Sequence, residues 1–293
     1  MANIGFVGLG NMGLPMAVNL MKAGHMVTGF DMQPKALEAF DACGGQSVHS
    51  LEQLVDFQDV VITMLQTGDQ VQQVCLDEHG VFSMMQPGSL YVDCSTIDVV
   101  TARVIHQAAE AVGILMADAP VSGGVAGAQA ASLSFMVGCT EPVFSKVSPI
   151  LSDMGSKIIH TGAAGSGQAA KVCNNMVLGV SMIAVSEAFV LAQGLGLSPE
   201  KLLEVISNAS GQCWVTDKYL PVPDLMENVP ANNDYRPGFS AAMMLKDLRL
   251  SQQAAADHDL HLSVAAQATA MYQTFNEAGN GDLDFSAIIK AVN

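Results

Sequence analysis

The stretch that decides the fold reads Ile4-Gly5-Phe6-Val7-Gly8-Leu9-Gly10-Asn11-Met12-Gly13. Its first four residues predict a short buried strand, and its glycines then fit the pattern G-x-G-x-x-G at the start of a helical pattern. In that context Gly8 makes the tight turn, Gly10 lets the backbone approach a pyrophosphate, and Gly13 lets helix and strand pack closely. The free N–H groups at the start of the helix would face the phosphates. The stretch therefore predicts dinucleotide binding by Gly8, Gly10, Asn11, Met12 and Gly13, the alternative being a glycine-rich turn without a ligand.

Asp31 stands at the end of the next predicted strand, Met26–Phe30, and its carboxylate can accept hydrogen bonds from the hydroxyls of an adenosine ribose. The same negative charge would repel a 2′-phosphate. The residues that follow, Met32, Gln33 and Pro34, offer no cation to bind one. The sequence therefore favours NAD over NADP as the cofactor.

Short apolar strands alternate with helical patterns up to about residue 160, which is typical of βαβ units around a mainly parallel, doubly wound sheet. After Gly167 only helical patterns follow. We therefore expect an α/β Rossmann-type domain over residues 1–163 and an all-α domain over residues 164–293, joined by a long interdomain helix at about 167–195. The predicted strands are Asn3–Val7, Met26–Phe30, 59–64, 89–92, 114–117, 133–137 and 157–159. The main predicted helices are 12–22, 34–42, 99–112, 142–154, 199–208, 240–256, 262–277 and 285–292.

The long interdomain helix is apolar on nearly every face, so it could lie in a membrane, in the protein core or against a second subunit. Polar residues interrupt it at Asn174, Asn175, Ser181, Ser186 and Glu187, and no run of eighteen apolar residues occurs. A helix that is apolar all round in a soluble protein is usually buried. We expect burial in the core or against a second subunit, and no membrane.

The charge balance argues against several kinds of partner. In 293 residues there are 12 Lys and Arg against 28 Asp and Glu, a formal net charge of −16. Such a surface repels phosphate backbones and anionic lipid, so we expect no nucleic-acid partner. The six cysteines are widely spaced and the histidines do not cluster, so we expect reduced thiols, no metal site and, with a strand beginning at Asn3, a cytoplasmic location.

Two further loops follow predicted strands of the sheet. Residues 64–67 follow the third strand and residues 93–96 follow the fourth. Ligands of doubly wound sheets bind outside the carboxyl ends of the strands, so both loops are candidates for cofactor contact. From position alone, either loop could be an ordinary turn.

The segment Asp118–Gly124 contains the turn Ser122-Gly123-Gly124 and is followed by small residues. Such a turn exposes backbone N–H groups and one hydroxyl, which suit a substrate carboxylate. A flexible loop is the alternative interpretation.

Lys171 opens the long apolar helix, and no other basic residue occurs before Lys201. Desolvation disfavours the charged form of lysine, so we expect its pKa to fall toward neutral pH and the amine to exchange a proton with an alcohol or aldehyde oxygen. Asn175 lies four residues later and shares a helix face with it. The alternative is a solvated lysine at a helix start.

Taken in order, these motifs resemble the β-hydroxyacid dehydrogenase family over nearly the whole chain. The resemblance rests on residues 8–13, on Asn19-Leu20, on residues 118–124 and 165–175, and on Lys246-Asp247-Leu248. The stretch Ser210-Gly211-Gln212-Cys213-Trp214, followed by residues 221–223 and 229–233, is most similar to the 3-hydroxyisobutyrate dehydrogenases of that family.

The resemblance implies oxidation of 3-hydroxyisobutyrate to methylmalonate semialdehyde with NAD, as in valine degradation, by a homodimer or homotetramer. It implies Lys171 as the catalytic acid/base. By position, the substrate would be held by Ser122, Gly123, Gly124, Asn175 and Trp214. The cofactor would be contacted, beyond the glycine turn, by Leu65, Gln66, Thr96 and Lys246. Alternatives are reduction of tartronate semialdehyde, 3-hydroxypropionate chemistry, succinic semialdehyde reduction, or a non-catalytic NAD-sensing module.

Two positions depart from the family pattern. Gln66 stands where many members have proline, which would loosen the adenine-side loop. Gln212 stands where close members have arginine, which leaves the substrate open within the family.

Overall fold

The computed structural model describes residues 1–56 and 58–292, and the chain forms two compact units, Met1–Lys171 and Val172–Asn293. The division falls inside the 29-residue helix α9, Ser166–Gly194. The domain boundary expected from the sequence, between residues 163 and 164, lies just before this helix. Each unit is described by itself.

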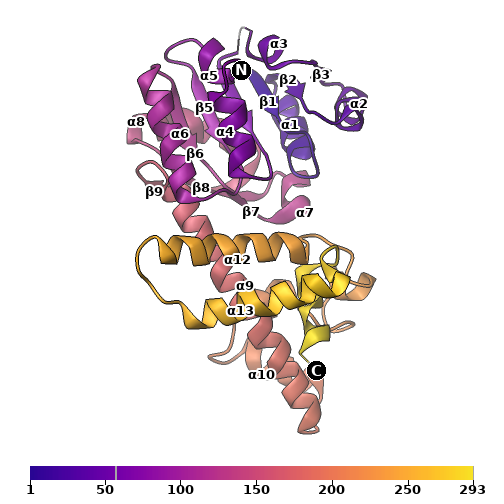
Figure 1. The fold of residues 1–293 in the computed structure, drawn as a ribbon. Coiled ribbons are helices and arrows are strands. Elements are labelled where there is room, and N and C mark those ends of the chain that lie inside the picture. Colours follow the sequence, from indigo (N-terminus) through magenta and orange to yellow (C-terminus); the bar gives the residue numbers. More distant parts are fainter. Residues whose placement is uncertain (57, 293) are drawn as a thin grey trace. The chain divides into compact units, whose positions relative to one another are not determined.

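Unit 1 is built on one nine-stranded sheet, with the strand order β3-β2-β1-β4-β5-β6-β8-β7 and with β9 beside β8 (Figure 1). Neighbouring strands are parallel from β3 to β6, whereas β8 is antiparallel to β6 and β7. The expected doubly wound, mainly parallel sheet is confirmed. The strands are β1 (Asn3–Val7), β2 (Met26–Phe30), β3 (Gln46–Ser47), β4 (Val60–Thr63), β5 (Leu90–Asp93), β6 (Leu115–Asp118), β7 (Val121–Ser122), β8 (Leu133–Gly138) and β9 (Gly155–Gly162).

Both faces of the sheet are buried, as a parallel sheet requires. Val60 and Ile62 of β4 belong to one apolar cluster, and Val61 between them belongs to the cluster on the other face. The helices of unit 1 cover these faces; α1, α4 and α6 are labelled in Figure 1. They are α1 (Gly13–Lys22), α2 (Pro34–Ala42), α3 (Leu51–Val55), α4 (Gly68–Leu76), α5 (Val81–Met84), α6 (Val99–Ala111), α7 (Gly124–Gln129) and α8 (Glu141–Ser152).

The sheet reverses its direction of growth at β1. From β1 the chain moves outward to β2 and β3, and it then returns to place β4 on the other side of β1. The carboxyl ends of β1 and β4 therefore lie next to each other at a topological switch point, where doubly wound sheets bind their ligands. The glycine turn follows β1 there.

Unit 2 is helical and has its own apolar core, which includes Met182, Phe189 and Leu248. The continuation of α9 packs closely on α12, because a Cβ at Gly179 would meet Met244 Sδ and Leu248 Cδ2 at 3.0 Å each. Helices α12 and α13 lie side by side (Figure 1). The remaining elements are α10 (Pro199–Ser207), α11 (Trp214–Lys218), the 3-10 helix η1 (Pro230–Asn233), α12 (Ala241–Ala256), α13 (Ser263–Phe275), the π-helical turn η2 (Asn276–Asn280) and the 3-10 helix η3 (Phe285–Ala291).

Helix α9 is less buried than its composition predicts. Among the described residues, α9 is the one helix that is long and apolar enough to cross a membrane. In its most apolar stretch of 18 residues, 44% is buried. Val177 and Leu191 are 59% and 63% exposed. They lie on one helical stripe with Ala184, which is also exposed. The core of this chain therefore does not cover the stripe, which leads into the exposed Leu195, and burial against a second subunit stays a prediction.

Side-chain caps explain where several helices begin. A hydroxyl or carboxylate accepts a hydrogen bond from a first-turn N–H at α3, α4, α6, α10 and α12, the capping residues being Ser50, Thr67, Asp98, Ser198 and Ser240. The short strands β3 and β7 and the short helices α3, α5, α7 and α11 lack a hydrophobic period long enough to be predicted.

The end of the chain differs from the predicted helix at residues 285–292. Gly279 has a φ of 86°, which ends the helical path of α13 and η2, and the final segment η3 is a 3-10 helix. The carboxylate of Asp284 caps the start of η3. Its Oδ1 accepts from the N–H and hydroxyl of Ser286, and its Oδ2 accepts from Tyr219 Oη and from the N–H groups of Gly238 and Phe239.

Candidate active site

The turn after β1 has the geometry expected of each glycine. Gly8 has a φ of +94°, and its N–H donates to the Phe30 carbonyl at 2.9 Å. A Cβ at Gly13 would overlap the Gly8 carbonyl oxygen and would lie 3.1 Å from the Phe6 ring. A Cβ at Gly10 would meet no described atom within 4 Å, and α1 has no side-chain cap among the described residues. The turn therefore offers open space and helix N–H groups to a pyrophosphate.

Asp31 is tied to this turn. Its Oδ2 accepts from the Leu9 N–H at 2.7 Å, and its Oδ1 accepts from the Gln33 N–H at 2.8 Å. A carboxylate has about four acceptor positions, so both oxygens can still accept from ribose hydroxyls. The carboxylate, the turn and the open space beside Gly10 together fit an adenine dinucleotide.

The loops after β4 and β5 are joined to each other and to the glycine turn. The Leu65 N–H donates to Ser95 Oγ at 2.8 Å, and Leu65 Cδ2 lies 3.1 Å from the position of a Cβ at Gly8. Thr96 is half-buried in the second loop, and Gln66 is exposed in the first. The Gln66 N–H, which a proline would lack, donates to Gln70 Oε1 at 3.0 Å, so this departure from the family pattern adds a tie to α4.

Asp93 organises the second loop from inside the protein. Its side chain is fully buried, and its Oδ1 accepts from Thr63 Oγ1 at 2.8 Å and from the Ser95 N–H at 3.1 Å. Its Oδ2 has no hydrogen-bond partner among the described residues. Burial raises the pKa of Asp93 from 3.8 to about 6; the hydrogen bonds from Ser95 and Thr63 oppose the rise, and the nearby Asp118 carboxylate adds to it.

This raised pKa predicts a pH-dependent stability. Between about pH 4 and pH 6 the folded chain holds a proton on Asp93 that the unfolded chain has lost, so the free energy of unfolding falls as pH rises through that window. The difference between a pKa of 3.8 and one of about 6 corresponds to ~3 kcal/mol in the free energy of unfolding. We expect Asp93→Asn to gain up to that amount relative to the unsubstituted protein between pH 4 and pH 7, as measured by urea unfolding. A difference between the two proteins that does not vary with pH would contradict this prediction.

The Ser122-Gly123-Gly124 turn has a backbone that requires its glycines. Gly123 has a φ of +133° and Gly124 a φ of +61°, both in the region that L side chains rarely adopt. Ser122 ends β7 and is half-buried, and α7 begins at Gly124. The turn therefore leads from β7 directly into the first turn of α7.

Lys171 lies in the second turn of α9 and is only 7% exposed. The start of this helix is held by Asp118 at the end of β6. Asp118 Oδ1 accepts from the Gly165 N–H at 2.8 Å, and its Oδ2 accepts from the Gln168 N–H at 2.9 Å. Asp118 also lies 2.9 Å from His106 Nε2.

In unit 2, Asn175 is 2% exposed and its Nδ2 donates to Asp247 Oδ2 through a short hydrogen bond. Asn175 Oδ1 accepts from Asn174 Nδ2 at 2.9 Å. Asp247 follows Lys246, which is half-buried. Two separated motifs named in the sequence analysis, residues 165–175 and 246–248, therefore meet through the amide of Asn175.

Trp214, the remaining expected substrate residue, opens α11 and is 51% exposed. Its ring stacks on Tyr219 at a centroid distance of 5.2 Å. The neighbouring Gln212 donates from Nε2 to Asp217 Oδ2 at 2.9 Å. The structure thus gives Trp214 a packed aromatic partner and leaves part of its surface open.

Asp118 as the cap of α9, Ser95 and Gln168 are site residues that the sequence did not predict. Each acts through contacts that span tens of residues, such as Gln168 to Ser95 across 73 positions. The available signal was that all three lie in stretches with a predicted function, Asp118 in 118–124, Ser95 in 93–96 and Gln168 in 165–175.

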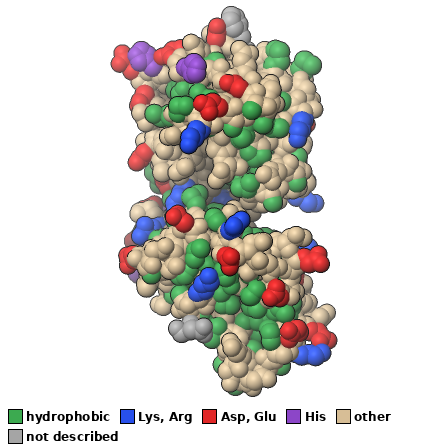
Figure 2. All heavy atoms as spheres, turned by 90° about the vertical axis from the view of Figure 1, so that its right-hand side faces the viewer, with side chains coloured by type: hydrophobic (Ala, Val, Ile, Leu, Met, Phe, Trp, Pro, Cys, Tyr) green, Lys and Arg blue, Asp and Glu red, His purple; other side chains and the backbone are tan. Residues whose placement is uncertain are grey.

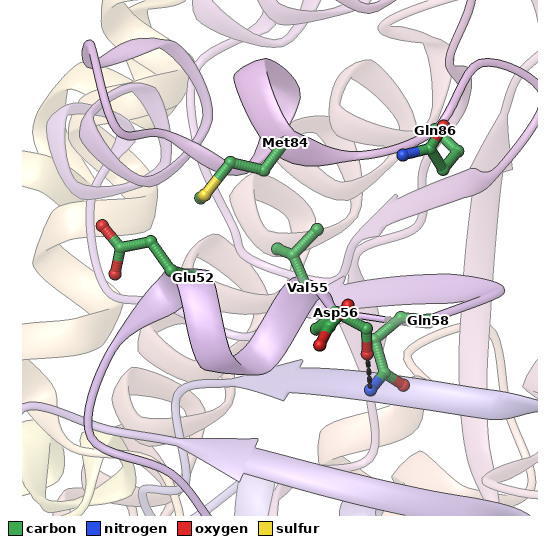
Figure 3. Close-up of a pocket in the computed structure, with 6 residues that line it drawn as sticks. All are labelled: Glu52, Val55, Asp56, Gln58, Met84 and Gln86. Carbon is green, nitrogen blue, oxygen red and sulfur yellow. Dashed lines mark hydrogen bonds between the residues drawn. The ribbon is translucent and has the colours of Figure 1, made fainter.

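A shallow pocket elsewhere in unit 1 is not part of this site. It lies between α3 and the segment around α5 and is lined by Glu52, Val55, Asp56, Gln58, Met84 and Gln86, with Gln58 Nε2 donating to the Asp56 carbonyl at 3.2 Å (Figure 3). None of the expected site residues lines it. Among the described residues, no group of three His, Cys, Asp or Glu side chains could hold a metal ion.

Comparison with known families decides what kind of protein carries this geometry. Residues 3–162 match the family described as the NAD binding domain of 6-phosphogluconate dehydrogenase. Residues 165–292 match the family described as NAD-binding of NADP-dependent 3-hydroxyisobutyrate dehydrogenase. The probable 3-hydroxyisobutyrate dehydrogenase of Mycobacterium tuberculosis is 50% identical over 289 residues, which cover 99% of this chain and 97% of that protein. The chain belongs to the β-hydroxyacid dehydrogenase family. As a member it is an NAD-dependent oxidoreductase of the 3-hydroxyisobutyrate dehydrogenase type.

Two further comparisons of this β-hydroxyacid dehydrogenase name L-serine. The NAD-dependent L-serine dehydrogenase of Pseudomonas aeruginosa is 42% identical over 290 residues, covering 99% of this chain and 97% of that protein. The solved structure of M. tuberculosis 3-hydroxyisobutyrate dehydrogenase with L-serine is 49% identical, covers 100% of this chain and 99% of its own, and superimposes with a TM-score of 0.95. The names of these relatives therefore include two compounds, 3-hydroxyisobutyrate and L-serine.

Proposed function

We propose that this β-hydroxyacid dehydrogenase oxidises 3-hydroxyisobutyrate reversibly to methylmalonate semialdehyde, with Lys171 as its general acid/base. The observation that carries the proposal is the burial of Lys171, 7% exposed, in a helix whose start is fixed by Asp118. Removal from water disfavours the charged ammonium, and a neutral amine can act as a base near neutral pH.

The proposed roles follow from the chemistry of the substrate. In oxidation the Lys171 amine accepts the proton of the substrate hydroxyl, and in reduction it returns that proton to the aldehyde oxygen. NAD, when bound, supplies the nicotinamide ring that accepts the hydride. The Ser122 hydroxyl and the N–H groups of the following glycines bind the substrate carboxylate. Asn175, one helical turn after Lys171, orients the substrate, which gives the alignment that hydride transfer needs.

L-serine is the second candidate substrate. It is also a β-hydroxy acid, and the relatives named above include an L-serine dehydrogenase and a structure solved with L-serine. Steady-state kcat/KM, followed by NADH absorbance, should be compared for 3-hydroxyisobutyrate, L-serine and 3-hydroxypropionate, and in reduction for tartronate and succinic semialdehydes. We expect the highest value for 3-hydroxyisobutyrate. A higher value for another acid would replace the substrate, and no turnover with any would leave only the NAD-sensing interpretation.

The Asp31 carboxylate should decide between NAD and NADP. Asp31→Asn keeps an oxygen for the Leu9 N–H and removes the charge that opposes a 2′-phosphate. We expect the ratio of kcat/KM with NADP to kcat/KM with NAD to rise about tenfold, an energy difference of about 1.4 kcal/mol. Adding Met32→Arg should raise the ratio further. An unsubstituted protein that already prefers NADP would contradict this role of Asp31.

We propose that a second copy of the chain covers the exposed apolar stripe of α9 in unit 2. Val177, Leu191 and Leu195 are 59%, 63% and 75% exposed, and α10 has no buried residue. Hydrophobic and charged side chains are interspersed on the face shown in Figure 2. The double variant Leu191→Glu, Leu195→Glu should shift a dimer or tetramer toward monomer in light scattering, whereas Val100→Glu on α6 should not. A monomeric unsubstituted protein would contradict the proposal.

We further propose that the enzyme acts in the cytoplasm and in valine catabolism, in accord with the proposed substrate. The proposed substrate carries the branched carbon skeleton that valine yields. Growth of a deletion strain on valine, with and without the gene restored, tests this assignment.

A further inference from the structure

Gln168 joins three parts of unit 1 through three hydrogen bonds. Its backbone N–H donates to Asp118 Oδ2 at 2.9 Å, its Nε2 donates to the Ser95 carbonyl at 2.7 Å, and its Oε1 accepts from the Ile97 N–H at 3.2 Å. The residue is fully buried. Gln168 therefore connects the first turn of α9 to the end of β6 and to the loop after β5.

The side-chain bonds of Gln168 clamp the peptides on both sides of Thr96. Ser95, whose carbonyl accepts from Nε2, precedes Thr96, and Ile97, whose N–H donates to Oε1, follows it. Ser95 Oγ in turn accepts from the Leu65 N–H. The amide of Gln168 is thus bound to the loop after β5, which carries the expected cofactor contact Thr96, and Ser95 links this loop to Leu65 in the loop after β4.

The start of α9 cannot slide past these contacts. A Cβ at Gly138 would lie 2.5 Å from Asp118 Oδ1 and 2.7 Å from the Gly167 nitrogen, and a Cβ at Gly167 would lie 2.5 Å from the Asp118 carbonyl oxygen. The backbones of α9, β6 and β8 therefore pack closely at Gly138 and Gly167, where the carboxylate of Asp118 leaves no room for a further side chain. With the translation of the helix fixed in this way, the amide of Gln168 fixes its rotation.

We propose that Gln168 is a positioning residue that sets the Lys171 amine relative to the cofactor loop at Thr96. Lys171 lies three residues after Gln168, on the neighbouring turn of the same helix face. A small rotation of the helix would move a side chain as long as lysine by about 1 Å, and a misplacement of that size can cost about a hundredfold in rate. The proposal rests on the proposed acid/base role of Lys171.

Two substitutions separate positioning from packing. Gln168→Met keeps the length of the side chain and the backbone bond to Asp118 but removes both bonds to the Thr96 loop. Gln168→Glu has the same shape as glutamine. When ionised it cannot donate to the Ser95 carbonyl. Its charge would also add to those of Asp118, which accepts from the backbone N–H of residue 168 and lies beside His106, and of Asp93, which accepts from the Ser95 N–H. When protonated it donates to Ser95 through its O–H and accepts from Ile97, as glutamine does.

The experiment measures kcat, KM and the deuterium isotope effect on kcat with 3-hydroxyisobutyrate deuterated at the hydroxyl-bearing carbon. We expect kcat of Gln168→Met to fall about ten- to a hundredfold with KM for the acid changed less than about threefold, and with a larger isotope effect. For Gln168→Glu, the ratio of its kcat to that of the unsubstituted enzyme should rise at least about tenfold from pH 9 to pH 6. The same ratio for Gln168→Met should stay flat. Gln193→Met, exposed on the same helix, is the control and should have unchanged kinetics.

Lys171→Ala is measured beside these variants, so that two failures can be told apart. If Lys171→Ala is inactive while Gln168→Met behaves as the unsubstituted enzyme, the positioning role is overturned and the proposed function stands. If it turns over normally, the proposed function is overturned and the positioning role with it. A pH-independent ratio for Gln168→Glu would overturn the positioning role even if both Gln168 variants are slow. Should Gln168→Met fail to fold, the pH dependence of Gln168→Glu decides.

Discussion

Replacing Lys171 by alanine should lower kcat by about two to four powers of ten, on the scale of a lost general acid/base. No amine would then remain at this point of α9 to accept the hydroxyl proton. NAD affinity should change little, because the turn after β1 and the carboxylate of Asp31 stay in place. Steady-state kinetics with 3-hydroxyisobutyrate and a fluorescence titration with NADH measure the two effects separately.

Two controls sharpen the Lys171 experiment. Lys157→Ala removes an exposed lysine from β9 and should leave kcat unchanged. Small primary amines added to Lys171→Ala should restore part of the rate, since they can enter the space left by the side chain and accept the same proton. Near-normal turnover of Lys171→Ala without added amine would remove this lysine from the mechanism.

Alanine at Gly10 should weaken NAD binding, whereas alanine at Gly13, three positions later, should destabilise the fold. Gly10 does not have a positive φ, and its Cβ would point into open space among the described residues, so Gly10→Ala should fold normally. The added methyl occupies the approach to the pyrophosphate. We expect Kd for NAD to rise about tenfold or more, or about 1.4 kcal/mol.

Gly13→Ala should instead destabilise the fold. Its Cβ would overlap the Gly8 carbonyl oxygen, so β1 and α1 would have to separate. Overpacking of this kind costs about 1–3 kcal/mol. Thermal unfolding in the absence of NAD should therefore show a lower Tm for Gly13→Ala and an unchanged or higher Tm for Gly10→Ala. The assigned roles of the glycines would be wrong if both variants had the same Tm and the same Kd.

The parts of the fold that could be predicted are those whose cause is local in the sequence. Residues 4–13 contain a strand, a turn and a helix start within ten positions, and strand β2 was predicted with its observed bounds, Met26–Phe30. The place of Asp31 beside the glycine turn could be predicted for the same reason, because Asp31 stands directly after β2, which pairs with β1. In each case the residue type and its distance along the chain determine the geometry.

The parts that could not be predicted depend on tertiary contacts. The cap of α9 comes from Asp118, 50 positions before Gln168, and no spacing rule relates the two. The exposed stripe of α9 is likewise invisible in a composition that is apolar on almost every face. The amide of Asn175 meets Asp247 across 72 positions, although both motifs had been noticed separately.

The carboxylate of Asp284 has a consequence for handling the protein. Five donors from Tyr219, Gly238, Phe239 and Ser286 share this one side chain. Carboxypeptidase digestion that removed Asp284 would free the Tyr219 hydroxyl, and the Tyr219 ring is the one on which Trp214 stacks. Proteolytic trimming or a designed truncation should therefore stop short of Asp284, because its loss would free an aromatic residue sixty-five positions upstream.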